Sequence, residues 1–89
     1  MYDIKLTDSA TTDLSSISHS DANRVADKIE WLGNNFEETP HFRLHGKEWK
    51  DCFKFRVGDY RIVYTIDHSH RLIIIQRIQH RKEVYKDKN

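Results

Sequence analysis

Residues 53–64 read FKFRVGDYRIVY and set the architecture of this chain. Apolar side chains alternate with charged or polar ones on both sides of the central Gly58-Asp59 pair, as in strands with one buried face. A Gly-Asp pair between two such runs is a signal for a two-residue hairpin turn. A turn of that length places Val57 opposite Tyr60 and thereby fixes the register of both strands. The stretch therefore predicts an antiparallel hairpin of defined pairing.

That register sorts the side chains of the hairpin onto two faces. The apolar face is expected to meet the core and collects Phe53, Phe55, Val57, Tyr60, Ile62, Tyr64 and Ile66. The other face brings Arg56 directly opposite Arg61, beside Lys54. Like charges opposed in a sheet are unfavourable by a few tenths to ~1 kcal/mol. An anionic ligand would offset that repulsion; the alternative is a solvated face on which long side chains splay apart.

The residues before the hairpin read as one strand followed by two helices. Residues 2–6 alternate in polarity, and apolar residues then recur at helical spacing in two successive runs. The first helix is expected to be capped by Asp8 or Ser9, and the second to restart at Ser20 or Asp21. Together they predict a helical hairpin that lays its apolar stripe on a sheet.

The remaining segments complete that sheet. Residues 36–46 are expected to form a loop or crossing segment, and strands are expected over residues 49–57, 60–67 and 71–78. The last of these has a continuous apolar run, which favours a central position. A short helix is expected over residues 81–86. The predicted fold class is α+β: an N-terminal strand and a helical hairpin packed on one face of a mostly antiparallel sheet of about four strands, with a short C-terminal helix.

The composition is that of one folded domain with a strongly ionic surface. The chain has 89 residues, of which 37% are hydrophobic and 33% charged, enough for a single modest core. No apolar run approaches the ~18 residues of a membrane span, and the first residues lack the pattern of a secretory signal. A single cysteine, Cys52, excludes an internal disulfide and a zinc site built from thiolates. We therefore expect a cytoplasmic protein with no membrane partner.

Charge is distributed unevenly along the chain, although the net charge is only +1. Residues 1–42 hold three Lys or Arg and eight Asp or Glu, whereas residues 43–89 hold twelve Lys or Arg and six Asp or Glu. A basic half of this kind is typical of a polyanionic partner such as nucleic acid. The counts alone leave the ordinary alternative open, in which the charges only solvate the surface.

A second basic group follows the last predicted strand. If the chain is helical from Arg81, then Arg81 and Tyr85 lie one turn apart on the same face. Basic side chains beside an exposed aromatic ring can hold a phosphate and stack an unpaired base. Trp49, flanked by Lys47 and Lys50, offers a similar combination, although packing is the commoner role of a tryptophan.

Three motifs of this chain carry a family resemblance: Arg43-Leu44-His45-Gly46, the stretch 53–64, and His80-Arg81-Lys82-Glu83-Val84-Tyr85. With the opening strand and helical hairpin, they resemble the RelE/ParE toxin superfamily of bacterial toxin–antitoxin modules. The resemblance implies that residues 1–89 form a single RelE-like toxin domain. It also implies a cognate, RelB-like antitoxin that wraps the toxin. Family members are mainly ribosome-dependent mRNA endonucleases or gyrase inhibitors, and the basic motifs here resemble the endonuclease branch.

For an endonuclease, the resemblance implies that messenger RNA is cut on the ribosome and translation is inhibited. RNA is cleaved when its 2′-OH is deprotonated and attacks the adjacent phosphorus, giving a 2′,3′-cyclic phosphate and a 5′-OH. We expect Lys54 to be the base, because neighbouring cations favour its neutral form. Arg61 is expected to clamp the phosphate with its forked guanidinium. Arg81 would stabilise the developing charge and hand over a proton, with His80 as the competing acid or base.

The other site residues are expected to hold the RNA. Tyr85 would complete the catalytic group by stacking on or orienting a base, and Arg56 would position the backbone. Further RNA contacts are expected from Lys47, Lys50 and Lys82. No cluster of carboxylates offers a magnesium site, so we expect no metal and no small-molecule cofactor, and activity in the presence of a chelator.

Two other functions remain open at this point. The first is a ParE-like toxin that inhibits gyrase through protein–protein contact, with no chemistry of its own. The second is a non-catalytic module of the same fold that binds RNA or an antitoxin. On overexpression, degraded mRNA would indicate the endonuclease and broken DNA the gyrase inhibitor. Binding without cleavage would indicate the non-catalytic module.

Overall fold

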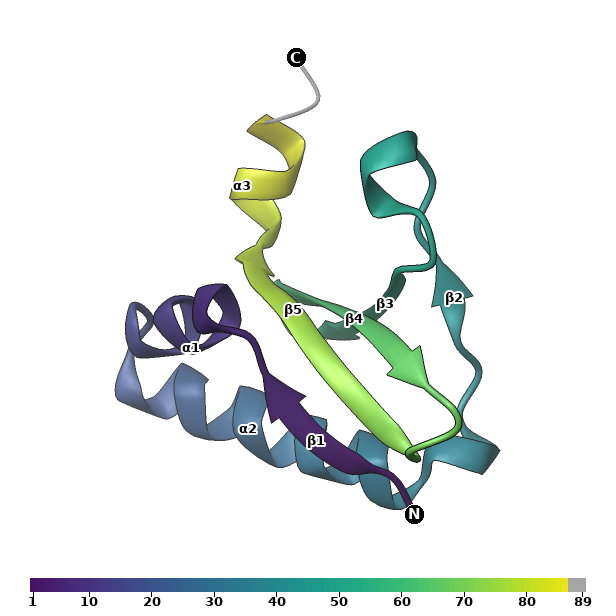
Figure 1. The fold of residues 1–89 in the computed structure, drawn as a ribbon. Coiled ribbons are helices and arrows are strands. Elements are labelled where there is room, and N and C mark those ends of the chain that lie inside the picture. The colour runs from purple at the N-terminus through teal and green to yellow at the C-terminus, as the bar shows by residue number, and fades with distance from the viewer. Residues whose placement is uncertain (87–89) are drawn as a thin grey trace.

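A five-stranded sheet with two helices on one side forms the body of the protein (Figure 1). The computed structural model describes residues 1–86, with side chains described through residue 83. The elements in chain order are β1 (Asp3–Leu6), α1 (Asp8–Ser15), α2 (His19–Asn34), the 3-10 helix η1 (Phe36–Glu38), β2 (Phe42–Arg43), the 3-10 helix η2 (Lys47–Trp49), β3 (Phe53–Val57), β4 (Tyr60–Asp67), β5 (Leu72–His80) and α3 (Arg81–Lys86). The strand order is β1-β5-β4-β3-β2. Among the described residues, no helix is both long and apolar enough to cross a bilayer.

The central hairpin has the predicted register. Val57 pairs with Tyr60, Arg56 with Arg61, and the pairing continues in step to Phe53 and Tyr64. Gly58 has a φ of +58°, a left-handed conformation that glycine adopts without strain. The predicted apolar face packs into the core. The register and the apolar face are therefore confirmed. β5 is an inner strand between β1 and β4, but the central strand of the five is β4.

Both helices begin earlier than the sequence suggested. Thr7 caps α1, because its hydroxyl accepts a hydrogen bond from the Ala10 N–H at 3.1 Å. Ser18 caps α2 in the same way through the Asp21 N–H at 3.2 Å. In each case the cap is the last extended residue before the helical run, so the N-cap predictions at Asp8 or Ser9 and at Ser20 or Asp21 were wrong by one to three residues.

The sheet has one strand more than the four or so expected. Two residues of the predicted loop, Phe42 and Arg43, form β2 and pair with Lys54 and Phe53. A two-residue strand shows no alternation by which a sequence pattern could find it. The following strand begins at residue 53 rather than 49, because the chain first forms η2 and then a left-handed turn.

A β-bulge shifts the pairing of β4 with β5 by one residue. Tyr64 pairs with Ile75, but the preceding Val63 pairs with Arg77, which leaves Gln76 without an opposite residue. Side chains alternate between faces, so this extra residue exchanges the two faces of β5 beyond it. Ile78 therefore enters the core, where it is only 3% exposed, although it follows Ile75 by three positions.

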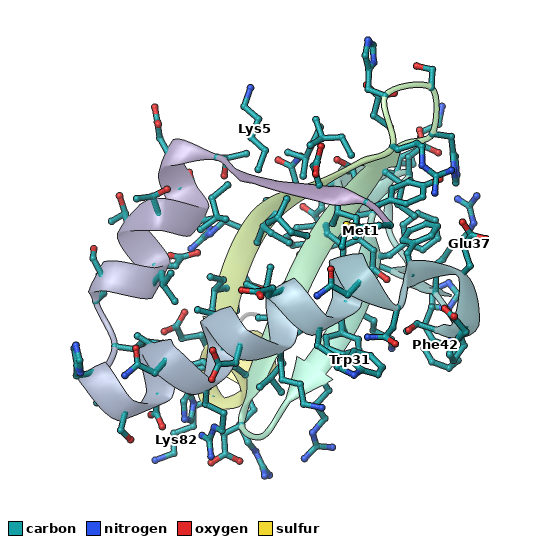
Figure 2. All side chains as sticks on the ribbon, turned by 90° about the horizontal axis from the view of Figure 1, so that it is seen from below. Met1, Lys5, Trp31, Glu37, Phe42 and Lys82 are labelled. Atoms are coloured by element: carbon teal, nitrogen blue, oxygen red, sulfur yellow. The ribbon has the colours of Figure 1, made fainter. Side chains whose placement is uncertain are left out.

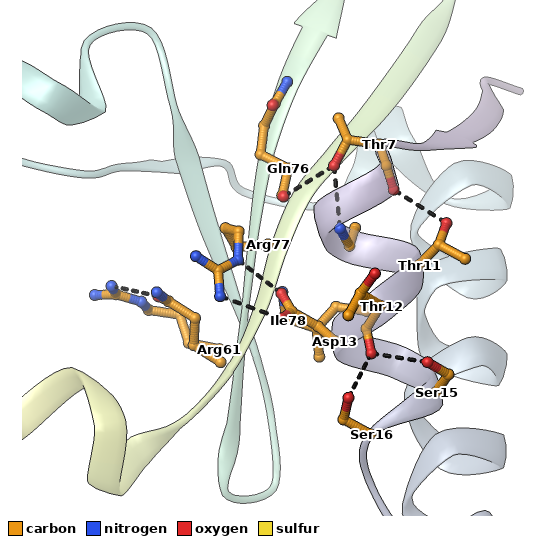
Figure 3. A network of polar contacts seen from close by, with 12 residues as sticks. Thr7, Thr11, Thr12, Asp13, Ser15, Ser16, Arg61, Gln76, Arg77 and Ile78 are labelled. Carbon is orange, nitrogen blue, oxygen red and sulfur yellow. Dashed lines mark hydrogen bonds and ion pairs between the residues drawn. The ribbon is translucent and has the colours of Figure 1, made fainter.

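The edge of β5 beyond β1 is covered by α1 (Figure 3). Pairing with β1 ends at Ile75, and the carboxylate of Asp13 takes over at this edge. It accepts hydrogen bonds from the Ile78 N–H at 2.9 Å and from Arg77 Nε and Nη2 at 2.8 and 3.1 Å. Thr7 donates to the Gln76 carbonyl at the bulge. Backbone groups left open by the sheet are thus satisfied by side chains of α1 and of its N-cap residue, Thr7.

Gly33 allows α2 to approach β1 closely, which leads to a stability prediction. A Cβ atom at this position would lie 2.6 Å from the backbone oxygen of Tyr2. Alanine normally stabilises a helix by up to ~1 kcal/mol over glycine, whereas overpacking a rigid backbone contact is unfavourable by about 1–3 kcal/mol. The clash should outweigh the gain in helix propensity, so Gly33→Ala is expected to lower the free energy of unfolding in a denaturant titration. Asn34→Ala, at the exposed neighbouring position, should leave it unchanged or raise it; equal stabilities for Gly33→Ala and the unaltered protein would contradict the prediction.

Candidate functional site

One groove brings together four of the predicted basic residues. Lys54 and Arg56 from β3, Arg61 from β4 and Arg81 from α3 line a cavity of about 790 Å³. The rest of its lining comes from α2, from the segment that crosses to β2, from β2 itself and from other residues of the hairpin, and it includes the acidic residues Glu38 and Asp59. The β3–β4 hairpin and the start of α3 therefore place guanidinium and ammonium groups around one space. Such a cluster attracts an anion.

Arg61 is the most enclosed of these cations. Its Nη2 donates a hydrogen bond to Gln79 Oε1 at 2.9 Å, and its guanidinium carbon lies 5.7 Å from the centre of the Trp49 ring. Its Nε is buried and has no hydrogen-bond partner among the described residues. Burial lowers the pKa of the Arg61 guanidinium from its ordinary value. An arginine nevertheless stays protonated in proteins, so Arg61 presents a fixed, partly desolvated positive charge.

The repulsion between the opposed arginines is reduced by the direction of Arg56. Its Nε donates to the Gly58 carbonyl at 3.0 Å, so the side chain turns toward the hairpin turn. Lys54 and Arg56 are both exposed. Arg56 thus turns away from Arg61, as expected for a solvated face, but Lys54, Arg56 and Arg61 still line the same groove.

Arg81 is tied to the hairpin turn. Its backbone N–H donates to the Asp59 carbonyl at 2.7 Å, and its Nη1 lies 3.6 Å from Asp59 Oδ1. Both side chains are more than half exposed, so the ion pair itself contributes little stability. The backbone hydrogen bond is the contact that fixes where α3 begins relative to β4.

His80 lies apart from the cationic groove. It pairs with Tyr60, whose ring belongs to the core face, and the two rings are perpendicular at 5.2 Å. His80 Nδ1 accepts a hydrogen bond from the Lys82 N–H at 3.1 Å, which places the proton of a neutral ring on Nε2. The structure therefore does not bring His80 to the face that carries Arg61.

The other predicted RNA contacts do not line the groove. Lys47 and Lys50 are exposed on either side of Trp49, and Lys82 is exposed in the first turn of α3. Tyr85 belongs to α3, but its side chain lies outside the described residues. Its stacking role remains a prediction.

Sequence reasoning missed the aromatic part of the groove. Trp31 and Phe42 are 43% and 60% exposed, and both line the groove together with Phe55. Trp31 stacks on Phe55 with ring centres 6.2 Å apart, and Lys28 Nζ lies 4.9 Å from the Trp31 ring centre. Figure 2 shows Trp31 and Phe42 at the same end of the molecule. Trp31 lies outside the apolar stripe of its helix, which was the available signal for its exposure.

Gln79 was also missed. It is buried, with 6% of its surface exposed, and lies opposite Arg61 because of the bulge at Gln76. The available signal was the spacing of three residues between Ile75 and Ile78, which breaks the period of two expected of a regular strand.

Histidine and cysteine residues have structural contacts. His41 bonds to the buried Tyr64 hydroxyl at 2.6 Å, and burial raises the pKa of Tyr64 well above its ordinary value. Cys52 is buried. Burial, and to a smaller extent the nearby charge of Asp51, raises the pKa of its thiol. Among the described residues, no three His, Cys, Asp or Glu side chains are grouped so that they could hold a metal ion.

Comparison with known proteins gives consistent results. Residues 4–85 match the family described as the ParE toxin of the type II toxin–antitoxin system parDE. Toxin RelG of Mycobacterium tuberculosis is 38% identical over 40 residues, which are 45% of this chain and 46% of that toxin, so the match spans about half of the relative's length.

Solved structures extend the similarity to the whole fold. One is the toxin–antitoxin complex RelBE2 of M. tuberculosis, with a TM-score of 0.77 and 25% identity over 89% of this chain and 96% of the matched chain. Another is the isolated RelE toxin of E. coli, with a TM-score of 0.73 and 17% identity over 99% and 95% of the two chains. A third is the archaeal RelE–RelB complex of Pyrococcus horikoshii, with a TM-score of 0.69 and 23% identity over 90% and 94%. At 17% and 23% identity the similarity establishes the fold alone.

Proposed function

The chain belongs to the ParE toxin family of type II toxin–antitoxin systems, within the RelE/ParE superfamily, and we propose that it inhibits translation by cutting messenger RNA on the ribosome. The observation that carries this proposal is the shared groove of Lys54, Arg56, Arg61 and Arg81. Inhibition of another protein by contact alone does not require this particular set of a lysine and three arginines around one cavity. The cleavage of RNA does, because negative charge increases on the phosphate as the reaction proceeds.

The proposed reaction is a transfer of the phosphoryl group within the RNA. The side-chain amine of Lys54 takes the proton of a 2′-OH, whose oxygen then forms a bond to the adjacent phosphorus. The bond from phosphorus to the 5′-oxygen breaks; the charge of Arg81 stabilises that oxygen, which takes a proton from water. The products are a 2′,3′-cyclic phosphate and a 5′-OH. Lys54 is preferred to His80 as the base, because His80 Nδ1 is occupied and its ring lies by Tyr60.

Arg61 and the surrounding cations supply binding and charge stabilisation in this proposal. The forked guanidinium of Arg61 donates to the oxygens of the scissile phosphate. Arg56 positions the neighbouring backbone, while Tyr85 stacks on or orients a base. Lys47, Lys50 and Lys82 attract the RNA from a distance. Salt at 0.1 M screens this attraction beyond about 10 Å.

We also propose that a RelB-like antitoxin wraps this protein and covers the groove. Similar solved structures include complexes named RelBE and RelE–RelB. In this chain, exposed Trp31 and Phe42 continue directly into the cationic residues of the same groove. An acidic, amphipathic polypeptide matches such a surface, with apolar side chains at one end and carboxylates at the other. A toxin with these partners works in the cytoplasm, where the ribosomes are.

The chemistry of the RNA ends tests the proposed function. The protein should be added to a purified translation system, and the ends of a defined mRNA should be mapped in the presence and absence of ribosomes. We expect cuts that require ribosomes, with 5′-OH ends that a polynucleotide kinase can phosphorylate and with 2′,3′-cyclic phosphates. Ends with a 5′-phosphate and a 3′-OH would contradict the proposal, because they indicate attack by water, as in metal-assisted hydrolysis.

Gyrase inhibition is the second candidate, because the matching family model is that of ParE. It predicts broken DNA and intact mRNA after expression of the protein. Binding to ribosomes or RNA with neither outcome would favour the non-catalytic module.

A further inference from the structure

Gln79 is the one buried polar or charged side chain among the described residues. It lies one residue before the end of β5, on the sheet face that carries Arg61. Burial of an amide is unfavourable unless its polar atoms find partners. An apolar residue would fill this position without that cost, so the contacts of the Gln79 amide must account for its presence here.

Its contact is with the guanidinium of Arg61. Gln79 Oε1 accepts a hydrogen bond from Arg61 Nη2 at 2.9 Å. A guanidinium has donors only, so the oxygen of the amide, and not its nitrogen, must face it. The two residues are directly opposite each other on adjacent antiparallel strands, where the backbone positions are set by the β4–β5 ladder. Gln79 thus holds the guanidinium from a rigid part of the fold.

The Trp49 ring also packs near Arg61, and the Gln79 hydrogen bond fixes the orientation of its guanidinium. The Trp49 ring lies 5.7 Å from the guanidinium carbon. Nε is buried without a hydrogen-bond partner among the described residues, so Gln79 supplies the hydrogen bond that fixes the plane of the group. The donors of Nη1 remain available to an anion. We propose that Gln79 is a positioning residue for Arg61, an inference that rests on the proposed function.

The neutrality of Gln79 is part of the inference. A carboxylate at the same place would hold Arg61 as firmly but would also cancel its charge. A glutamine holds the group and leaves the full positive charge for a phosphate. Two substitutions therefore separate the two properties: Gln79→Met removes the acceptor at similar size, and Gln79→Glu keeps the acceptor but adds a negative charge.

The first experiment observes Arg61 directly and does not depend on cleavage. The exchange rate of the Arg61 Nε–H proton is measured by NMR in ¹⁵N-labelled protein, with its signal assigned through Arg61→Lys. We expect about tenfold faster exchange in Gln79→Met, because the loss of the Nη2 hydrogen bond frees the guanidinium and lets the buried Nε reach water, and no change in Gln79→Glu. Gln76→Met is the matched control, because Gln76 lies on the same strand but bonds to Thr65. An unchanged rate in folded Gln79→Met overturns the inference.

The second experiment measures cleavage of mRNA on ribosomes. Gln79→Met should lower kcat about tenfold with little change in KM, because the charge remains but its orientation is lost. Gln79→Glu should chiefly raise KM, because the net charge of the site falls.

If Gln79→Met does not fold, the test rests on Gln79→Glu: a KM equal to that of the unaltered protein overturns the inference. If the unaltered protein does not cut RNA while the NMR result holds, the proposed function fails and the Gln79–Arg61 restraint stands. If cleavage by Gln79→Met is undiminished, the positioning role is overturned.

Discussion

Arg61→Ala is expected to slow the cleavage of mRNA on ribosomes by about 100-fold or more. Arg61 is the most enclosed cation of the groove, with Gln79 on one side and Trp49 near its guanidinium carbon. A fixed, partly desolvated donor stabilises the charge that builds up on phosphorus far better than a mobile, hydrated one. Single-turnover cleavage of a defined mRNA, followed by primer extension, measures the loss.

The fold should survive this substitution. Removal of Arg61 relieves its opposition to Arg56, worth a few tenths to ~1 kcal/mol, but leaves the buried Gln79 amide without its partner, at about 1–3 kcal/mol. The net loss of stability is therefore small, and a thermal melt followed by circular dichroism checks it. Arg71→Ala is the matched control, because it removes a guanidinium from the turn beyond the other end of β4. Cleavage by Arg61→Ala at the rate of the Arg71→Ala control would remove Arg61 from the proposed site.

Lys54→Met is expected to lower the cleavage rate about 100-fold or more, in the range typical for the loss of a general base. Lys54 is exposed and lines the groove with Arg61 and Arg81, so its substitution removes no packing in the core. Lys54→Arg should be as inactive as Lys54→Met, because an arginine keeps the charge but does not give up its proton in proteins. The same single-turnover assay compares the two.

The two substitutions distinguish a base from a simple charge. If Lys54→Arg restores most of the rate, Lys54 acts by charge alone and another group removes the proton. Lys5→Met, an exposed position on β1 at the far side of the sheet, should cut as the unaltered protein does. An equal rate for Lys54→Met and Lys5→Met would show that Lys54 has no part in the reaction.

Local sequence patterns determined the hairpin and its two faces. A two-residue turn at Gly58-Asp59 and a side-chain period of two leave one register for β3 and β4, and the structure has it. The bounds of β4 and α3 are also those predicted, because each is delimited by a turn signal or a change of period within a few residues. What failed were the helix caps, β2, the start of β3 and the bounds of β5. At these places several adjacent residues satisfy the same local rule, or too few residues carry any pattern.

What the tertiary structure alone decided is which residues stand beside the hairpin. Without the bulge at Gln76, β5 would have placed Ile78 opposite Arg61 and Gln79 opposite Tyr60. The single extra residue reverses this, because burying Ile78 in the core is favourable and burying Arg77 or Gln79 there is not. Gln79 thereby meets Arg61, while His80 turns to Tyr60. The sequence by itself determined that a lysine and two arginines share a face, but only packing between distant strands determined how Arg61 is held there.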